Sequence, residues 1–168
     1  MNIVLTGFMA SGKTEISKAI AELSKYTLVD TDDMIADKMQ MTINEIFDEY
    51  GEEYFRKVER EIIREVSGLR DVVISTGGGV VLCKENITAL RKTGIIFNLS
   101  PDFSVIADRL NEARKTRPLL KQDSIENIEK RFNDRKPFYA DCDYTIDVIN
   151  GRTPRSYAME ILKIMEER

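Results

Sequence analysis

The segment that decides the fold lies near the start of the chain, where residues 7–14 read GFMASGKT. It matches the pattern G-x-x-x-x-G-K-[ST], in which backbone N–H groups and the start of the next helix surround phosphate oxygens. In such a loop Lys13 can bridge the β- and γ-phosphates, and Thr14 can place its hydroxyl on Mg²⁺. An apolar run precedes the loop at residues 3–5, and apolar residues at helical spacing follow it at residues 16–23. The sequence therefore predicts a strand, a phosphate-binding loop and a helix in succession.

Short apolar runs alternate with segments of helical period along the rest of the chain. The runs that predict strands cover residues 3–5, 28–29, 72–74, 95–97 and 144–146. Apolar residues spaced as i, i+3, i+4 and i+7 predict helices at residues 16–23, 43–50, 103–110 and 158–165. Near-continuous apolar strands alternating with helices are typical of a parallel α/β sheet with right-handed crossovers. Because no linker-like stretch interrupts the pattern, we expect a single domain over residues 1–168.

Composition excludes several classes of function. The 168 residues carry 25 Lys and Arg against 29 Asp and Glu, a net charge of −4, and contain no histidine. Triads that use histidine, histidine-bound zinc and an imidazole base are therefore excluded, and the two distant cysteines form no metal-binding pair. A mildly acidic chain does not favour nucleic-acid binding, and no apolar run approaches the roughly 20 residues of a membrane helix. With no cationic leader before an apolar stretch, we expect a cytoplasmic protein without nucleic-acid or membrane partners.

Two polar segments follow the second and third predicted strands. Residues 30–33 read DTDD, and residues 77–79 are three consecutive glycines. The carboxylates can cap the next helix, or they can orient Mg²⁺ and accept a proton from a substrate hydroxyl. The neighbouring phosphate loop favours the second interpretation. Three adjacent glycines cost stability when ordered, which indicates a backbone wall against a small ligand.

Two arginines complete the candidate site. Arg56 and Glu59 are three residues apart and can pair on one helix face. Such a pair is often a surface ion pair of little consequence. Together with Arg135, however, Arg56 can hold a carboxylate with two guanidinium forks.

A basic stretch from residue 111 to residue 123 lacks apolar period. We expect a loop there, either a mobile functional element or a plain solvated connection.

These motifs, in this order, resemble the shikimate kinase family, small P-loop kinases related to the nucleoside monophosphate kinases. The resemblance rests on the phosphate loop, D-T-D, F-R-x-x-E, the triple glycine, and R-P-L-L at residues 117–120. It implies a three-layer α/β sandwich with a five-stranded parallel sheet of order 2-3-1-4-5. It also implies substrate-binding helices at about 31–62 and a lid at about 111–121. The implied reaction moves the γ-phosphate of ATP to the 3-hydroxyl of shikimate, on the route to chorismate and the aromatic amino acids.

The resemblance also implies a role for each matching residue, with one Mg²⁺ per monomeric subunit. The implied ATP-binding residues are Gly7, Ala10, Ser11, Gly12, Lys13, Thr14, Ile16, Arg109, Arg117 and Pro154. The implied shikimate-binding residues are Asp32, Phe47, Phe55, Arg56, Glu59, Gly77, Gly78, Gly79 and Arg135. Lys13, Asp32 and Arg117 are the implied catalytic residues, and Thr14 and Asp30 the implied metal ligands, Asp30 through water.

Other functions remain open at this point. Another small-molecule kinase of this architecture, such as a gluconate or nucleotide kinase, need not contain the F-R-x-x-E and R-P-L-L segments. Proteins that resemble the GTP-binding switches carry an N-K-x-D motif, and the sequence has no such motif. A binding module without activity is disfavoured because Lys13 and Asp32 are both present.

Overall fold

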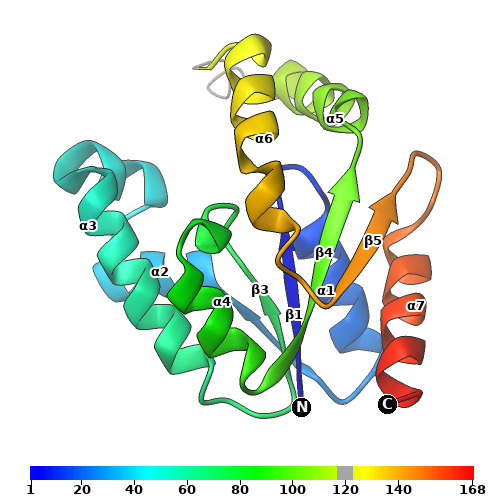
Figure 1. Ribbon diagram of the computed structural model, residues 1–168. Coiled ribbons are helices and arrows are strands. Elements are labelled where there is room, and N and C mark those ends of the chain that lie inside the picture. The colour runs from blue at the N-terminus through cyan, green and yellow to red at the C-terminus, as the bar shows by residue number, and fades with distance from the viewer. Residues whose placement is uncertain (117–122) are drawn as a thin grey trace.

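Residues 1–116 and 123–168 are described by a computed structural model, drawn in Figure 1. The strands are β1 (Asn2–Gly7), β2 (Thr27–Asp30), β3 (Val72–Ser75), β4 (Gly94–Pro101) and β5 (Tyr144–Val148). The helices are α1 (Lys13–Leu23), α2 (Thr31–Met39), α3 (Ile43–Val66), the 3₁₀ turn η1 (Val80–Leu82), α4 (Lys84–Arg91), α5 (Phe103–Thr116), α6 (Ile125–Tyr139) and α7 (Pro154–Glu166).

The five strands form one sheet of order β2-β3-β1-β4-β5, and every neighbouring pair is parallel. This confirms the predicted topology. Because all strands run the same way, their carboxyl ends lie along one edge, where ligands of open α/β sheets bind. Gly7, Asp30 and Ser75 end three adjacent strands at that edge.

Helices cover both faces of the sheet, and the side chains of each strand alternate between the two layers. Ile3 and Leu5 pack with α1 and α7, whereas Val4 between them packs with the helices of the other face. Figure 1 shows α7 on one side of the sheet and α3, α4 and α6 on the other. Both cores consist almost wholly of aliphatic and aromatic side chains, which explains the near-continuous apolar strands.

Local signals fix the helices that surround the site. Thr42 and Glu45 form a reciprocal capping box at the start of α3. Gly51 (φ 82°) has a non-helical, positive-φ backbone inside α3 and makes a kink between two helical pieces. Ser124 caps α6, and Thr153 with Pro154 begins α7.

The expectation of a loop from residue 111 was wrong for its first part, because α5 continues to Thr116. Arg114 and Lys115 lie in its last turn, where positive charge is favourable next to the helix C-terminus. The lack of apolar period reflects a helix end exposed to solvent rather than an irregular backbone. The Arg114 guanidinium donates to the Asp123 carbonyl at 2.6 Å and so connects the residues on either side of 117–122.

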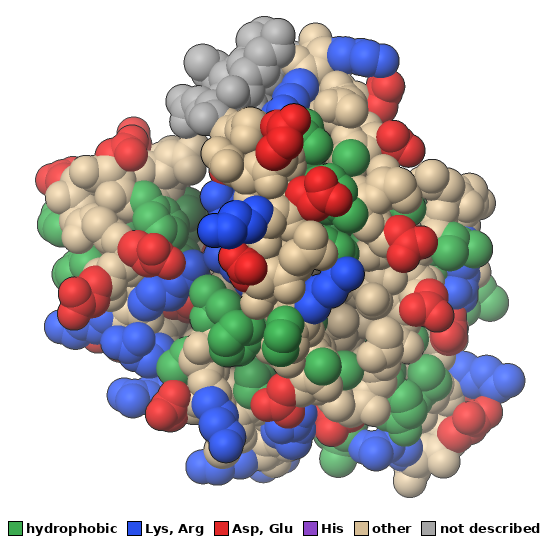
Figure 2. Space-filling model, turned by 45° about the horizontal axis from the view of Figure 1, so that its top comes forward, with side chains coloured by type: hydrophobic (Ala, Val, Ile, Leu, Met, Phe, Trp, Pro, Cys, Tyr) green, Lys and Arg blue, Asp and Glu red, His purple; other side chains and the backbone are tan. Residues whose placement is uncertain are grey.

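Basic and acidic side chains are interspersed over the face shown in Figure 2. Within the two described ranges, none of the helices has the length and apolar character needed to cross a membrane.

Candidate active site

The phosphate loop joins β1 to α1, and two of its glycines are required by geometry. A Cβ on Gly7 would lie 2.6 Å from the Ser11 Oγ and 3.0 Å from the Leu99 carbonyl oxygen. Gly12 (φ 99°) occupies the left-handed region at the start of α1, where other residues are strained. The loop therefore turns tightly and directs the first amides of α1 toward the sheet edge, as phosphate binding requires.

Lys13 extends back over the loop. Its Nζ donates to the carbonyl oxygens of Gly7 and Phe8, at 2.6 and 2.9 Å. Burial lowers the pKa of Lys13 to about 8, and the carboxylates of Asp32 and Asp30 oppose that shift. Phosphate oxygens would be stronger acceptors for this ammonium than the two carbonyls.

Asp30 and Asp32 take different positions at the end of β2. One oxygen of Asp30 accepts the N–H groups of Asp32 and Asp33, at 2.9 and 3.2 Å, so Asp30 does cap α2. Asp32 points instead at the glycine segment, where a Cβ on Gly77 would lie 2.6 Å from its Oδ1. Burial raises the pKa of Asp32, and Asp30 adds to the shift while Lys13 opposes it.

Arg56 lies against the other end of the glycine segment. A Cβ on Gly79 would overlap its guanidinium, whose Cζ is 2.6 Å away. The guanidinium donates to Glu59 at 2.9 Å and lies 3.5 Å from Glu52. Glu59 is only 1 % exposed, and burial raises its pKa while Arg56 opposes the shift. The pair is therefore a buried, oriented one rather than a surface ion pair.

The remaining predicted substrate residues surround the same space. Phe47 and Phe55 stack with ring centroids 4.4 Å apart, and the Arg56 guanidinium lies over Phe55. Arg135 lies over Phe8, with its Nη1 3.8 Å from where a Cβ of Gly78 would be. A Cβ of Gly78 would also lie 3.7 Å from the Gly7 carbonyl oxygen, which places the glycine segment beside the phosphate loop.

A pocket of about 280 Å³ on the α1 side of the loop combines six predicted nucleotide residues. These are Ala10, Ser11, Gly12, Ile16, Arg109 and Pro154. The Arg109 Nη1 donates to the Ala10 carbonyl at 2.8 Å, so α5 is tied to the loop. Arg109 and Pro154 thus face one cavity although 44 residues separate them in the sequence.

Arg152 and Tyr157 also line this pocket, although no sequence motif marks them. The Arg152 guanidinium lies 4.2 Å from the Tyr157 ring centroid and pairs with Glu160. The one sequence signal for Arg152 is its position two residues before Pro154, which was predicted to bind the nucleotide.

The residues present fit a hydrated Mg²⁺, which binds few protein oxygens and relies on phosphates and water for the rest. Thr14 lies in the first turn of α1, and Asp30 keeps one carboxylate oxygen outside its capping bonds. In the part of the chain that the structure describes, no group of three or more acidic or cysteine side chains forms a ready-made metal cage. Of the lid predicted at about residues 111–121, the part from 117 to 121, with Arg117, lies outside the described residues, and residues 111–116 belong to α5.

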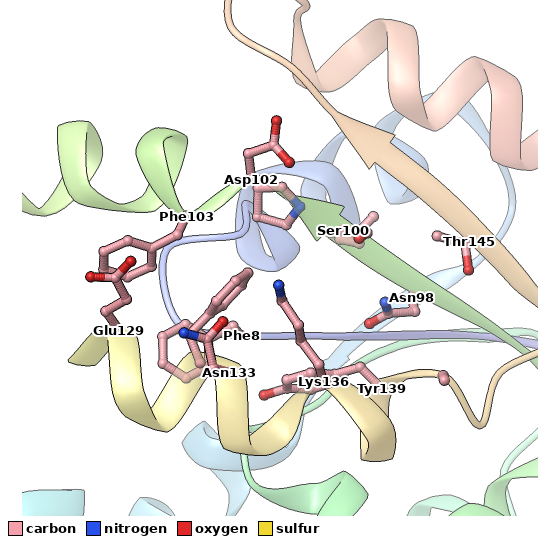
Figure 3. Close-up of a pocket in the computed structure, with 14 residues that line it drawn as sticks. Phe8, Asn98, Ser100, Asp102, Phe103, Glu129, Asn133, Lys136, Tyr139 and Thr145 are labelled. Atoms are coloured by element: carbon pink, nitrogen blue, oxygen red, sulfur yellow. The ribbon is translucent and has the colours of Figure 1, made fainter. Parts of the chain in front are cut away.

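A further pocket of about 430 Å³ lies between β4 and α6. Figure 3 shows Lys136 pointing into it, with Asp102 and Ser100 on one side and Phe8 and Tyr139 near its base. None of the predicted site residues lines it.

Comparison with known proteins identifies the family. The sequence model described as "Shikimate kinase" matches residues 9–166. A shikimate kinase of Caldicellulosiruptor bescii is 48 % identical over 164 residues, covering 97 % of this chain and 94 % of that protein. One from Caldicellulosiruptor saccharolyticus is 50 % identical with the same coverage.

Solved structures agree with the sequence relatives. The shikimate kinase from Acinetobacter baumannii in complex with shikimate has a TM-score of 0.87 and 32 % identity, covering 99 % of this chain and 93 % of that one. The shikimate kinase from Bacteroides thetaiotaomicron has a TM-score of 0.89 and 31 % identity, covering 99 % and 98 %. The chain therefore belongs to the shikimate kinase family, whose members are phosphotransferases that act on an alcohol group.

Proposed function

We propose that the protein transfers the γ-phosphate of ATP to the 3-hydroxyl of shikimate, giving shikimate 3-phosphate and ADP. The observation that carries this proposal is the position of the glycine segment 77–79. It lies beside the phosphate loop on one side, and it contacts Asp32 at one end and Arg56 at the other. A hydroxyl-activating carboxylate and a carboxylate-binding arginine therefore flank one small space next to the phosphates.

The nucleotide is assigned to the loop and the 280 Å³ pocket. Amides of the loop and the Lys13 ammonium bind the β- and γ-phosphates. The adenine base of ATP is assigned to the space between Arg109 and Pro154, which are far apart in the sequence but line the same pocket. One Mg²⁺ per subunit, held by Thr14 and through water by Asp30, neutralises phosphate charge when it is bound.

Shikimate is assigned to the space between Asp32, Arg56 and Arg135. The two guanidinium groups bind its carboxylate, and Glu59 keeps Arg56 oriented. Phe47 and Phe55 form the apolar side, and the three glycines form a wall that lets the ring approach the backbone. Fixing both substrates in one geometry supplies much of the rate enhancement in phosphoryl transfer.

The chemical step needs one proton acceptor. The 3-hydroxyl oxygen forms a bond to the γ-phosphorus, and the bond from that phosphorus to the β-phosphate oxygen breaks, releasing ADP. The hydroxyl proton passes to Asp32, whose raised pKa makes it a better base than an exposed aspartate. Lys13, and Arg117 from a lid at about residues 111–121 whose first residues form the end of α5, stabilise the negative charge of the group in transfer.

We further infer a cytoplasmic monomer of one domain, acting in the route to chorismate, with no nucleic-acid or membrane partner. A gluconate kinase-like acceptor is the alternative. It is disfavoured because two arginines, one of them paired with a buried glutamate, face the acceptor space.

The test is a coupled assay of ADP release with shikimate, gluconate and each nucleoside monophosphate, at equal concentration and with Mg²⁺ and ATP. We expect shikimate alone to support fast turnover, with phosphorylation of the 3-hydroxyl seen by ³¹P NMR. Lys13→Met is the control. It should greatly lower turnover with every acceptor, and the activity that remains should still prefer shikimate. Comparable turnover of gluconate would contradict the proposal.

A further inference from the structure

Tyr139 connects the last turn of α6 to the glycine segment. Its hydroxyl donates to the Gly78 carbonyl oxygen at 2.6 Å, and the side chain is only 6 % exposed. Burial raises the pKa of Tyr139, while the nearby Arg135 opposes the shift. The hydroxyl is therefore a protonated donor at neutral pH.

The same helix turn carries Arg135, four residues before Tyr139. Residues four apart lie on one face of a helix, so both side chains of α6 are directed at the glycine segment. The Arg135 guanidinium lies close to Gly78, and the Tyr139 hydroxyl binds the Gly78 carbonyl. On the far side, the Gly77 N–H donates to the Thr31 hydroxyl of α2 at 3.1 Å. The glycine segment is thus held between α2 and α6.

A flexible segment needs such restraints if it is to act as a wall. Three consecutive glycines lose more conformational freedom on ordering than any other tripeptide. Side chains of the segment itself cannot anchor it, because glycine has none. Backbone hydrogen bonds to Thr31 and Tyr139 supply the anchoring instead. Figure 3 shows Tyr139 beside Phe8 and Lys136 at the base of the neighbouring pocket, where its ring is packed.

We propose that Tyr139 is a positioning residue that fixes the glycine segment relative to Arg135, and so sets the affinity for the acceptor substrate. The proposal rests on the assignment of that space to shikimate. The Tyr139 hydroxyl bonds to the glycine segment and, among the residues that the structure describes, not to the phosphate loop. Tyr139 also belongs to the core on the opposite face of the sheet from the nucleotide pocket. Its effect should therefore fall on one substrate only.

Tyr139→Phe tests this, because it removes the hydroxyl and keeps the ring. We expect the KM for shikimate to rise about three- to ten-fold, the scale of one lost neutral hydrogen bond. The kcat and the KM for ATP should stay within two-fold. A purely structural role would lower the melting temperature without separating the two KM values.

Tyr157→Phe is the matched control. The Tyr157 side chain is also buried, and its hydroxyl exchanges hydrogen bonds with the N–H and carbonyl of Ile149 at 2.8 and 3.2 Å. It belongs to the core on the α1 and α7 face and lines the nucleotide pocket. Losing this hydroxyl, which makes two hydrogen bonds, should lower stability at least as much as Tyr139→Phe does, while any kinetic effect falls on ATP.

Hydrogen exchange gives a readout that does not depend on turnover. In Tyr139→Phe the amides of residues 77–80 should exchange faster than in the wild type, and in Tyr157→Phe they should not. Unchanged exchange, an unchanged KM for shikimate, or an equal rise of that KM in both variants would each overturn the proposal. If the wild type failed to phosphorylate shikimate, the proposed function would fall, and the exchange measurement would still decide whether the hydroxyl orders the segment.

Discussion

Replacing Gly79 by alanine places a methyl group where the Arg56 guanidinium lies. The backbone of Gly79 (φ −97°, ψ 0°) is open to alanine, so the substitution causes no left-handed strain. The new Cβ would lie 2.6 Å from the Arg56 Cζ, whereas non-bonded carbons prefer about 3.5–4.0 Å. The guanidinium must therefore move by about 1 Å or more.

The size of the effect follows from how Arg56 is held. Its side chain is 19 % exposed and is paired with the buried Glu59 at 2.9 Å, so a displacement disturbs an oriented donor. Its Nε is buried without a hydrogen-bond partner among the residues that the structure describes. A lost hydrogen bond to a charged group costs about 1.5–3 kcal/mol, which corresponds to a rise of roughly 10- to 150-fold in the KM for shikimate. The KM for ATP should not change.

The assay is steady-state kinetics with both substrates varied, on Gly79→Ala, Arg56→Lys and the double variant. Because alanine at 79 acts through Arg56, the double variant should be no worse than Arg56→Lys alone. Gly78→Ala is the spatial control, since its Cβ would meet its neighbours at 3.7–3.8 Å and should leave the Arg56–Glu59 pair in place. Additive effects of the two substitutions, or an unchanged KM in Gly79→Ala, would refute the reasoning.

Three further predictions concern the catalytic groups. Asp32→Asn should lower kcat about 10²-fold or more while ADP affinity, measured by calorimetry, is kept; turnover within a few-fold of wild type would leave Asp32 no role as base. In the wild type, kcat/KM for ATP should fall as pH rises through about 8, because the free enzyme then loses the Lys13 charge, and a flat profile to pH 10 would contradict this. Arg117→Ala should lower kcat roughly 10³-fold or more with shikimate affinity unchanged in the absence of nucleotide; an intact kcat would exclude it from the transition state.

The sheet and the phosphate loop could be predicted because their signals are local. The apolar run at residues 3–5 and the glycines at 7 and 12 are required by the backbone conformation within a few residues of each. Strand order followed from the family resemblance, and the observed order agrees with it. The end of α5 was missed, because its last turns carry mostly polar and charged side chains and so have no apolar period to reveal them.

Contacts across the site could not be derived from spacing. Arg56 against Gly79, and Tyr139 on Gly78, join elements that are 23 and 61 residues apart in the sequence. Neither side chain carries a local pattern that marks its partner. The sequence could say that glycines line a wall, but only the fold shows which donors hold that wall.

The position of its side chain distinguishes the proposed base, Asp32, from the aspartate beside it. Asp32 and Asp33 are adjacent aspartates, and burial raises the pKa of both, but only Asp32 faces the glycine segment and the Lys13 ammonium. The removal of water that lowers the pKa of Lys13 raises that of Asp32, and each group partly offsets the shift of the other. A γ-phosphate beside Lys13 would add negative charge near both, which favours a charged Lys13 and makes Asp32 a stronger proton acceptor. Binding of the nucleotide would thus prepare the base for the acceptor hydroxyl before any bond is broken.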